Sequence, residues 1–293
     1  MADLTVILNE TSGNAATRRR AVEEAFARAK LDVRIEGVNG ARIREAAARA
    51  AASSRTLVAA GGDGTVSAVA SVAAGTGATL GVLPLGTLNH FARDVGIPLE
   101  IDPAVDVIAA GYTRLLDIGT LDDRTFVNNA SLGYYPRIVR ERELERSRGH
   151  RKWVAFAIAV TRTWIRYRTV RVLMEVDGVA LRRRTPFVFI GNGEYKVEGL
   201  DIGTRTSLDS GRLWIYVAPE CGRFEMLMLS IRALGGLLGP AVKLEVFSAG
   251  EISIETRRVK VAVAIDGELV VTRPPLHCMS RSASLRTIVP RIE

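Results

Sequence analysis

The chain has 293 residues, of which 47% are hydrophobic and 25% charged, and its formal net charge is +8. This composition is typical of a folded protein of one or two domains and excludes a disordered chain. The two cysteines, Cys221 and Cys278, have no CxxC spacing and no histidine cluster nearby, which excludes a disulfide framework and a structural zinc site. The first twenty residues lack a signal-peptide core, and no apolar run reaches the roughly 18 residues of a spanning helix, so we expect a cytoplasmic protein.

The first 118 residues alternate between predicted strands and predicted helices. The hydrophobic patterns predict strands at 4–8, 33–38, 56–60 and 79–83, and helices at 17–30, 41–52, 66–74 and 89–94. Alternation of this kind predicts a parallel sheet with helices on both faces. We therefore expect an α/β domain over residues 1–118.

After residue 118 the pattern becomes that of an antiparallel β domain. Alternating or β-branched segments at 170–176, 187–190, 213–217, 259–265 and 269–272 predict strands, and helices are expected at 153–167 and 224–238. Asp177-Gly178 and Asp266-Gly267 are favoured pairs for hairpin turns. We expect a β-rich domain over residues 119–293, with the C-terminal tail as a segment that could return to the first domain.

The strongest chemical signal is Gly61-Gly62-Asp63-Gly64-Thr65, between the third predicted strand and the helix after it. Glycines let the backbone turn tightly and bring several N–H groups against a phosphate, and the start of a helix adds partial positive charge. Asp63 would repel a phosphate, so it suits a magnesium-bound water or a hydroxyl group instead. An ordinary glycine-rich turn is the alternative interpretation of the pentapeptide alone.

Two further turns follow neighbouring strands of the predicted sheet. In the segment 84–93, Thr87 and Asn89 offer neutral donors at a helix start, and Arg93 could face a phosphate or cap the helix. Asn9 to Gly13 follows the first strand and offers a third turn suited to an anion, although alone it is better read as a plain loop. Turns at the carboxyl ends of adjacent strands line the crevice in which open α/β sheets bind ligands.

In this order, the three segments resemble the diacylglycerol kinase catalytic domain family. That family includes bacterial lipid kinases and the sphingosine and ceramide kinases, and its nucleotide-binding fold is shared with phosphofructokinases and NAD kinases. Phe-Val-Asn-Asn-Ala-Ser-Leu-Gly at 126–133 and Asp266-Gly267-Glu268 extend the resemblance toward the C-terminus. The likeness thus spans nearly the whole chain.

The resemblance implies an ATP-binding catalytic domain of parallel-sheet type followed by a β-sandwich-like lipid-substrate domain, with ATP and Mg²⁺ as cofactors and a lipid hydroxyl as phosphate acceptor. It assigns the proton acceptor to Glu268, with Asp266 and Asp63 as neighbouring acids. Asp266-Gly267 could instead be only a hairpin turn. The ATP-binding residues that it implies are Asn9, Ser12, Gly13, Gly61, Gly62, Asp63, Gly64, Thr65, Val66, Ser67, Gly86, Thr87 and Asn89.

The chain departs from the family pattern at four places. Glu10 stands where the family usually has proline, and His90 stands where an aspartate is common. The family's metal-site acid is replaced by Ser210, which leaves Asp209, one residue earlier, as the candidate for a structural magnesium site. A threonine often found after the second strand is missing from the stretch 36–38.

Much of the positive charge lies between residues 137 and 184. No motif with interleaved aromatic residues accompanies it, so we expect no nucleic-acid partner. An anionic membrane surface is the partner that fits a lipid kinase, because each Lys or Arg near such a surface contributes about 1 kcal/mol of binding; a solvated basic face is the alternative. The apolar stretch 226–238 could line an acyl-chain pocket, lie on the membrane or, as we slightly prefer, belong to the core. Homodimer formation is left open.

Three functions remain in competition. The leading one is an ATP-dependent lipid kinase that contacts the membrane peripherally. A soluble-substrate kinase similar to NAD kinase is the second, although Asn128-Asn129 stands where such enzymes carry an Asn-Glu pair. The third is a lipid-binding protein with impaired catalysis, suggested by His90 and by the weak metal site. The sequence does not name the lipid.

Overall fold

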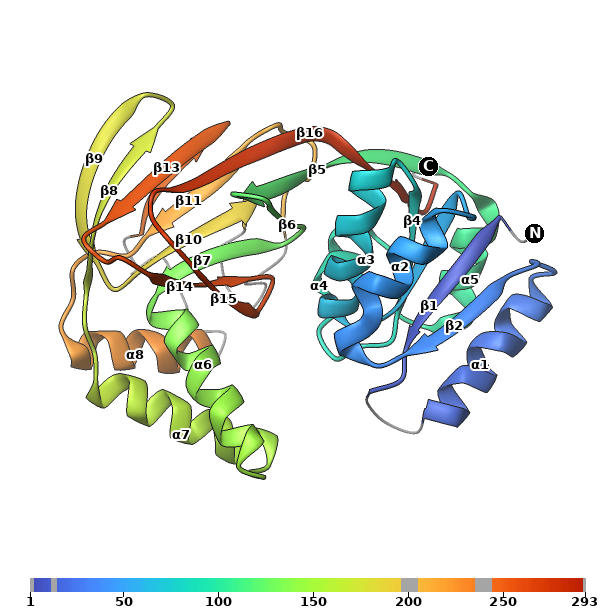
Figure 1. The fold of residues 1–293 in the computed structure, drawn as a ribbon, viewed down its shortest axis with the longest axis horizontal. Helices are drawn as coiled ribbons and strands as arrows, with labels where there is room; N and C mark the ends of the chain where they lie inside the picture. The colour runs from blue at the N-terminus through green and yellow to red at the C-terminus, as the bar shows by residue number, and fades with distance from the viewer. Residues whose placement is uncertain (1–2, 12–14, 196–204, 235–243, 292–293) are drawn as a thin grey trace. The chain divides into compact units, whose positions relative to one another are not determined.

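The computed structural model describes residues 3–11, 15–195, 205–234 and 244–291. The chain divides into two compact units. Unit 1 comprises Met1–Ile118 and Arg281–Glu293, and unit 2 comprises Gly119–Ser280. The chain passes between the units twice, once along β5 (Thr113–Leu121) and once along β16 (Leu276–Ile288) (Figure 1).

Unit 1 is built on a parallel sheet whose strand order is β2-β1-β3-β4. The end of β16 adds a further parallel strand, with Thr287 beside Leu80 of β4. Val6, Ile7 and Leu8 in β1 are completely buried, as expected for a strand covered on both faces. The predicted strands are confirmed within a residue or two at each end. Their bounds are Leu4–Asn9 for β1, Arg34–Val38 for β2, Thr56–Gly61 for β3 and Thr79–Pro84 for β4.

The helices of unit 1 pack as two pairs, α1 with α5 and α2 with α3. The connection from β1 runs through α1 to β2, whereas the connection from β3 runs the opposite way through α3 to β4. Right-handed crossovers in opposite directions place the two helix pairs on opposite faces and create a switch point between β1 and β3 (Figure 1). The bounds are Ala15–Arg28 for α1, Ile43–Ala51 for α2, Asp63–Thr76 for α3, His90–Asp94 for α4 and Ile101–Ala110 for α5, with a 3₁₀ turn at Gly40–Arg42.

The third helix begins earlier than the sequence pattern predicts. It starts at Asp63 rather than at residue 66, because the carbonyl of Gly62 already accepts hydrogen bonds from the N–H groups of Thr65 and Val66. The end of the Gly-Gly-Asp-Gly-Thr motif is therefore the first turn of α3. The helix α5 was not predicted.

Unit 2 contains two antiparallel sheets. The first has the order β12-β11-β10-β7-β14-β15, and the second combines β16, β13, β8 and β9 with the hairpin of β5 and β6. The strands of the first sheet are β7 (Asn129–Gly133), β10 (Phe187–Asn192), β11 (Leu213–Val217), β12 (Glu245–Ala249), β14 (Val261–Ile265) and β15 (Glu268–Thr272). The second sheet contains β6 (Arg124–Phe126), β8 (Val170–Val176), β9 (Val179–Thr185) and β13 (Glu251–Thr256), in addition to β5 and β16.

The inward-facing side chains of both sheets form one hydrophobic core. Leu132, Val188 and Ile190 of the first sheet and Met174 and Ile252 of the second are each at most 1% exposed. This is the packing of a β-sandwich, which confirms the fold class predicted for the second half. Both predicted hairpin turns are present, since Asp177-Gly178 and Asp266-Gly267 join consecutive strands with positive φ at both residues.

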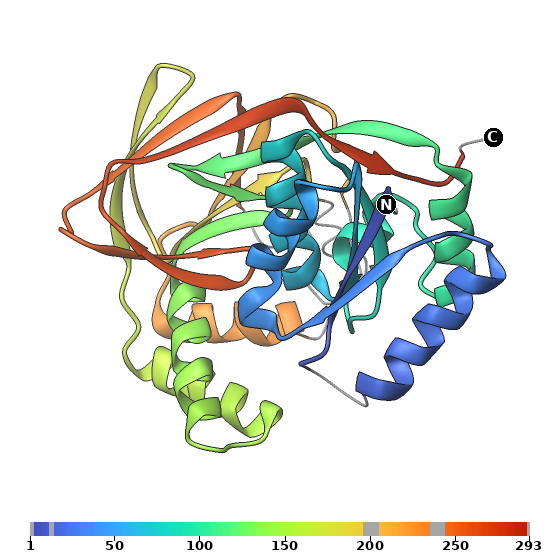
Figure 2. The ribbon, with the colours of Figure 1, turned by 45° about the vertical axis from the view of Figure 1, so that its right-hand side comes forward.

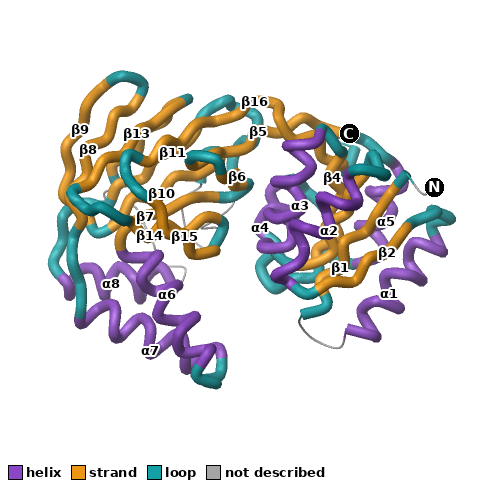
Figure 3. Tube along the Cα trace, in the orientation of Figure 1, coloured by secondary structure: helices purple, strands orange, loops and turns teal. Residues whose placement is uncertain are grey.

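Three helices accompany the sandwich, with α6 (Tyr134–Ser147) and α7 (Lys152–Ile165) forming a helical hairpin and α8 (Arg223–Leu234) beside α7 (Figures 2 and 3). Glu145 is buried between α6 and α7, where its carboxylate accepts hydrogen bonds from Arg148 and Arg162. The helix α6 was not predicted; residues 235–238 of the other predicted helix lie outside the described part. Among the described residues, no helix is long and apolar enough to cross a membrane.

Candidate functional site

The turn between β3 and α3 presents backbone N–H groups at a helix start. Gly62 is the N-cap residue, with an extended backbone at φ −89° and ψ −173°. The first N–H groups of a helix have no acceptor within it, so those of Asp63 and Gly64 can serve a ligand. The same end carries the positive pole of the helix dipole. This arrangement is suited to binding an anion such as a phosphate.

A side-chain hydrogen bond joins this turn to the turn after β1. Asn9 Nδ2 donates to Thr65 Oγ1 over 3.0 Å, and Thr65 is only 2% exposed. Asn9 Oδ1 in turn accepts the N–H of Thr11 at 3.0 Å. A Cβ atom at Gly61 would lie 2.3 Å from Thr65 Oγ1, so the threonine can occupy this position only above a glycine. The structure thus brings together two predicted site residues, Asn9 and Thr65, at the switch point of the sheet.

The turn after β4 lies directly against the turn after β3. Leu85 donates its N–H to the carbonyl of Gly61 at 2.9 Å, and a Cβ atom at Gly86 would lie 2.5 Å from the Cα of Gly62. Asn89 adopts a left-handed conformation (φ 51°) and uses both ends of its amide on Gly86, with Oδ1 accepting at 3.0 Å and Nδ2 donating at 3.1 Å. Asn89 therefore shapes this turn, and Thr87 is exposed at its tip.

Asp63 has an oxygen that the fold itself leaves without a hydrogen bond. Its Oδ1 is buried and has no partner among the described residues. A buried carboxylate oxygen is costly to leave unpaired, so a cation or an ordered water is the partner that suits it. Ser12 and Gly13, which are also predicted site residues, lie outside the described part of the chain.

Glu10, which replaces the usual proline, fills the space above Gly37. A Cβ atom at Gly37 would lie 2.2 Å from Glu10 Oε1, and Arg19 approaches the same oxygen at 3.4 Å. A side chain at position 37 would require the Glu10 carboxylate to move from this position. His90, the other departure near this site, is the first residue of α4.

In unit 2, Asp266 holds the segment 127–129 in place. Its Oδ2 accepts the N–H of Val127, and its Oδ1 accepts those of Asn128 and Asn129, all at 2.9 Å. Asp266 also donates its own N–H to the carbonyl of Asn129 at 2.8 Å. The carboxylate is thus engaged by backbone donors, and it ties the Asp-Gly-Glu turn to the segment 127–129.

Three residues that sequence reasoning missed complete this network. The guanidinium of Arg205, which is 7% exposed, donates to the carbonyls of Val127 and Asn192 and to Asn128 Oδ1. Asn192 donates from Nδ2 to the carbonyl of Val127 at 3.1 Å, and the hydroxyl of Tyr195 donates to the carbonyl of Asn128 at 3.1 Å. No motif in the sequence marks these residues, because their shared partners lie 13 to 78 positions away.

Glu268 differs from Asp266 in its surroundings. It is the first residue of β15, its side chain is exposed, and its carboxylate forms no hydrogen bond or ion pair with any described residue. The turn therefore carries two carboxylates of different kinds. That of Asp266 is hydrogen-bonded to the backbone, whereas that of Glu268, two residues later, has no partner among the described residues.

Asp209 lies in the turn before β11 and is exposed. Its Oδ1 accepts a hydrogen bond from the hydroxyl of Ser207 at 2.7 Å. Within the described residues, no group of three His, Cys, Asp or Glu side chains is arranged to hold a metal ion. A metal role for Asp209 stays a prediction from the resemblance, without a ligand set around it.

Two family models match the chain in succession. The model of the diacylglycerol kinase catalytic domain matches residues 3–121, and that of the YegS C-terminal NAD kinase beta sandwich-like domain matches residues 131–291. The chain belongs to the diacylglycerol kinase catalytic domain family, with a YegS-type C-terminal domain. This confirms the resemblance found from the motifs.

Relatives with similar sequences agree with this membership, and a solved structure shows the same fold. A "probable lipid kinase YegS-like" of Pseudomonas aeruginosa (strain UCBPP-PA14) is 38% identical over 138 residues, which are 46% of this chain and 45% of that protein. A protein of the same name from Klebsiella pneumoniae is 43% identical over 89 residues, covering 29% of this chain and 30% of the relative. Each alignment thus spans less than half of the relative. The crystal structure of a diacylglycerol kinase from Bacillus anthracis matches 98% of this chain and 96% of its own length with a TM-score of 0.70, and at 20% identity it shows the shared fold.

Proposed function

We propose that the protein is an ATP-dependent lipid kinase, which transfers the γ-phosphoryl group of ATP to a lipid hydroxyl. The observation that carries this proposal is the meeting of three turns at the carboxyl ends of β1, β3 and β4, with the N-terminus of α3 among them. Family membership and the names of the relatives, which are called lipid kinases, support it.

The nucleotide phosphates would bind to the backbone N–H groups of residues 61–67, with Thr87 donating from the neighbouring turn. Asp63 is the side chain that fits a Mg²⁺ ion accompanying the triphosphate, because its buried Oδ1 has no partner among the described residues. When bound, such an ion would neutralise charge on the phosphate oxygens. The close backbone approach of Gly86 to Gly62 keeps the two turns in fixed register.

The acceptor side of the reaction would use Glu268. Its carboxylate would take the proton of the lipid hydroxyl as that oxygen bonds to the γ-phosphorus, while the bond from phosphorus to the β-phosphate oxygen breaks and ADP leaves. Asp266 would act indirectly, by holding the turn that carries Glu268. The reaction requires that the bound γ-phosphate and this carboxylate meet at one lipid hydroxyl.

The lipid would be reached at a membrane surface. The net charge of +8 and the arginines of unit 2 support peripheral contact with an anionic bilayer. Diacylglycerol and similar alcohols are the acceptors that the names of the structural relatives favour.

The decisive experiment follows phosphate from γ-labelled ATP to diacylglycerol, phosphatidylglycerol, sphingosine, ceramide and, as a soluble acceptor, NAD. We expect one of the lipids to be labelled, and we expect Glu268→Gln to lower the rate by about 10²- to 10⁴-fold, the usual contribution of a proton acceptor. ATP binding should stay unchanged. Glu255→Gln is the matched control, because Glu255 is likewise an exposed glutamate of unit 2.

Three outcomes would contradict parts of the proposal. Labelling of NAD alone would favour a soluble-substrate kinase. Intact ATP binding without transfer to any lipid would favour a lipid-binding protein. Full activity of Glu268→Gln would remove Glu268 as the proton acceptor.

A further inference from the structure

Unit 2 carries a hollow lined by six arginines, at the junction of α6, α7 and the chain that follows α7. We call this the arginine hollow. It has a volume of about 560 Å³, and its other lining residues include a single acid, Glu141. Its arginines are Arg137, Arg140, Arg162, Arg166, Arg168 and Arg258.

Most of this positive charge has no acidic partner in the part of the chain that the structure describes. Arg162 pairs with Glu145 and lies 3.7 Å from Glu141, but the other five arginines form no ion pair with any described residue. Burial, together with the nearby guanidinium groups of Arg258 and Arg168, lowers the pKa of Arg137. Like charges held this close repel one another, and a bound anion would relieve the repulsion.

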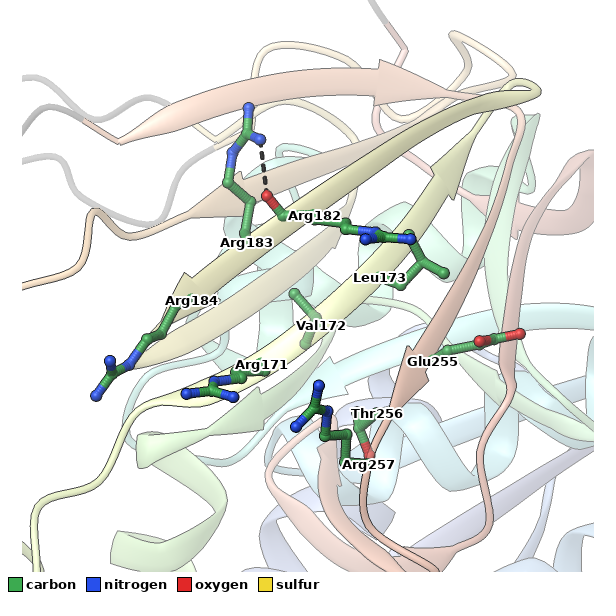
Figure 4. Close-up of a pocket in the computed structure, with 9 residues that line it drawn as sticks. All are labelled: Arg171, Val172, Leu173, Arg182, Arg183, Arg184, Glu255, Thr256 and Arg257. Atoms are coloured by element: carbon green, nitrogen blue, oxygen red, sulfur yellow. Dashed lines mark hydrogen bonds between the residues drawn. The ribbon is translucent and has the colours of Figure 1, made fainter.

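A second hollow, on the outer strands β8, β9 and β13, shows the contrast. Figure 4 shows its arginines spread along β8 and β9 and at Arg257. Here the fold supplies acids of its own, since Arg183 pairs with Glu245 at 2.8 Å and Arg184 with Glu220 at 3.1 Å. Among the described residues, two of the five arginines of the second hollow form ion pairs, whereas only Arg162 does so among the six of the arginine hollow. The arginine hollow therefore differs in how much unpaired positive charge it holds, and not in arginine content.

An exposed apolar side chain lines the arginine hollow, and others lie at the start of α8, which contacts the end of α7. Ile165 lines it and is 63% exposed. The end of α7 is fixed to the start of α8, because Trp164 Nε1 donates to the carbonyl of Arg223 at 3.0 Å and its ring meets that of Phe224 edge-on. Phe224 is 61% exposed and Met228 52%. A free phosphate ion would gain nothing from these apolar side chains, whereas a lipid whose chains continue into a bilayer would.

We propose that the arginine hollow binds the phosphate of an anionic phospholipid headgroup, with Ile165 and Phe224 inserted at the membrane surface. The planar guanidinium group binds phosphate oxygens in pairs, which makes arginine the suitable residue for such a site. All residues of this site belong to unit 2, and the inference does not rest on the kinase activity.

The test is co-sedimentation of the full chain with vesicles of phosphatidylcholine, with and without phosphatidylglycerol, at several salt concentrations. The variant Arg168→Gln/Arg258→Gln removes two exposed arginines of the hollow. We expect its affinity for the phosphatidylglycerol vesicles to fall about thirtyfold, since each arginine near an anionic surface contributes a factor of about five. The matched control Arg171→Gln/Arg257→Gln makes the same change of charge in the second hollow, three and one residues away in sequence, and should lose much less.

A second variant, Ile165→Ser/Phe224→Ser, and competition by inorganic phosphate separate the two sources of phosphate. For a lipid site, the serine variant binds the vesicles more weakly and millimolar phosphate does not displace the protein. If phosphate displaces it and the serine variant binds normally, the hollow holds a free anion and the lipid assignment is wrong. Equal losses in the two glutamine double variants would show diffuse electrostatic attraction and would overturn the site. Tryptophan fluorescence checks that each variant is folded.

Discussion

Two substitutions of Asp266 should destabilise unit 2 by different amounts, because this residue contributes in two separable ways, through its carboxylate and through its backbone conformation. The carboxylate accepts three backbone hydrogen bonds from the segment 127–129, and the backbone adopts φ 45° in a tight turn. Asparagine tolerates this backbone conformation and keeps one oxygen. Alanine keeps neither the acceptor oxygens nor the tolerance for a positive φ.

The expected losses follow from these contacts. A hydrogen bond to a charged group contributes about 1.5–3 kcal/mol. Asp266→Asn can keep the two bonds to Oδ1 but loses the bond from Val127 and the negative charge, which gives about 2 kcal/mol. Asp266→Ala loses all three bonds and adds about 1 kcal/mol for the left-handed backbone, which gives about 5.5 kcal/mol at the lower end of these contributions.

Urea unfolding followed by tryptophan fluorescence measures these losses selectively, because all three tryptophans, at positions 153, 164 and 214, belong to unit 2. With a slope of about 2 kcal/mol per molar urea, Asp266→Asn should lower the midpoint by about 1 M. Asp177→Asn, at the other Asp-Gly turn, is the control and should cost less, since its carboxylate is exposed. Equal losses in Asp266→Asn and Asp266→Ala, or no loss in either, would refute the reasoning.

Three further predictions concern other parts of the chain. Gly86→Ala should weaken ATP binding at least tenfold in a titration, since its Cβ would press on the backbone of the turn after β3, whereas Gly75→Ala, whose Cβ meets open space within α3, should bind normally. Burial would raise the pKa of Glu145, but the neighbouring Arg162 and Arg148 outweigh this effect and hold that pKa below its usual value. The ionised carboxylate therefore stabilises the folded protein fully above about pH 4.3, and this stabilisation is lost as the pH falls through the lowered pKa. The stability difference between Glu145→Gln and the unsubstituted protein should therefore shrink in unfolding curves below pH 4; a constant difference would contradict this. Burial raises the pKa of the Cys278 thiol, so a thiol reagent at pH 8 should modify only Cys221 in the folded protein, and modification of Cys278 before unfolding would be the contrary result.

Local features of the fold could be predicted from the sequence because their causes are local. The buried strand Val6 to Leu8 reads as an apolar run, and Asp266-Gly267 reads as a turn, because neither depends on distant residues. The predicted start of α3 lies three residues too late. The helix begins when the carbonyl of Gly62 accepts its first hydrogen bonds, and no apolar residue before Val66 signals the start. The helix α6 was not predicted because it is rich in charged residues, one of its buried residues is Glu145, and its buried positions follow no apolar periodicity.

The candidate site divides in the same way. The sequence by itself predicted which turn is suited to a phosphate, since glycines, a helix start and a threonine are adjacent in Gly61 to Thr65. Only the tertiary structure decided what the two acids of the Asp-Gly-Glu turn do. Asp266 meets backbone donors 137 to 139 positions away, while Glu268 stays exposed. Hydrogen bonds between distant segments form only when the chain has folded, and so it is the fold that distinguishes a carboxylate held by the protein from one left exposed.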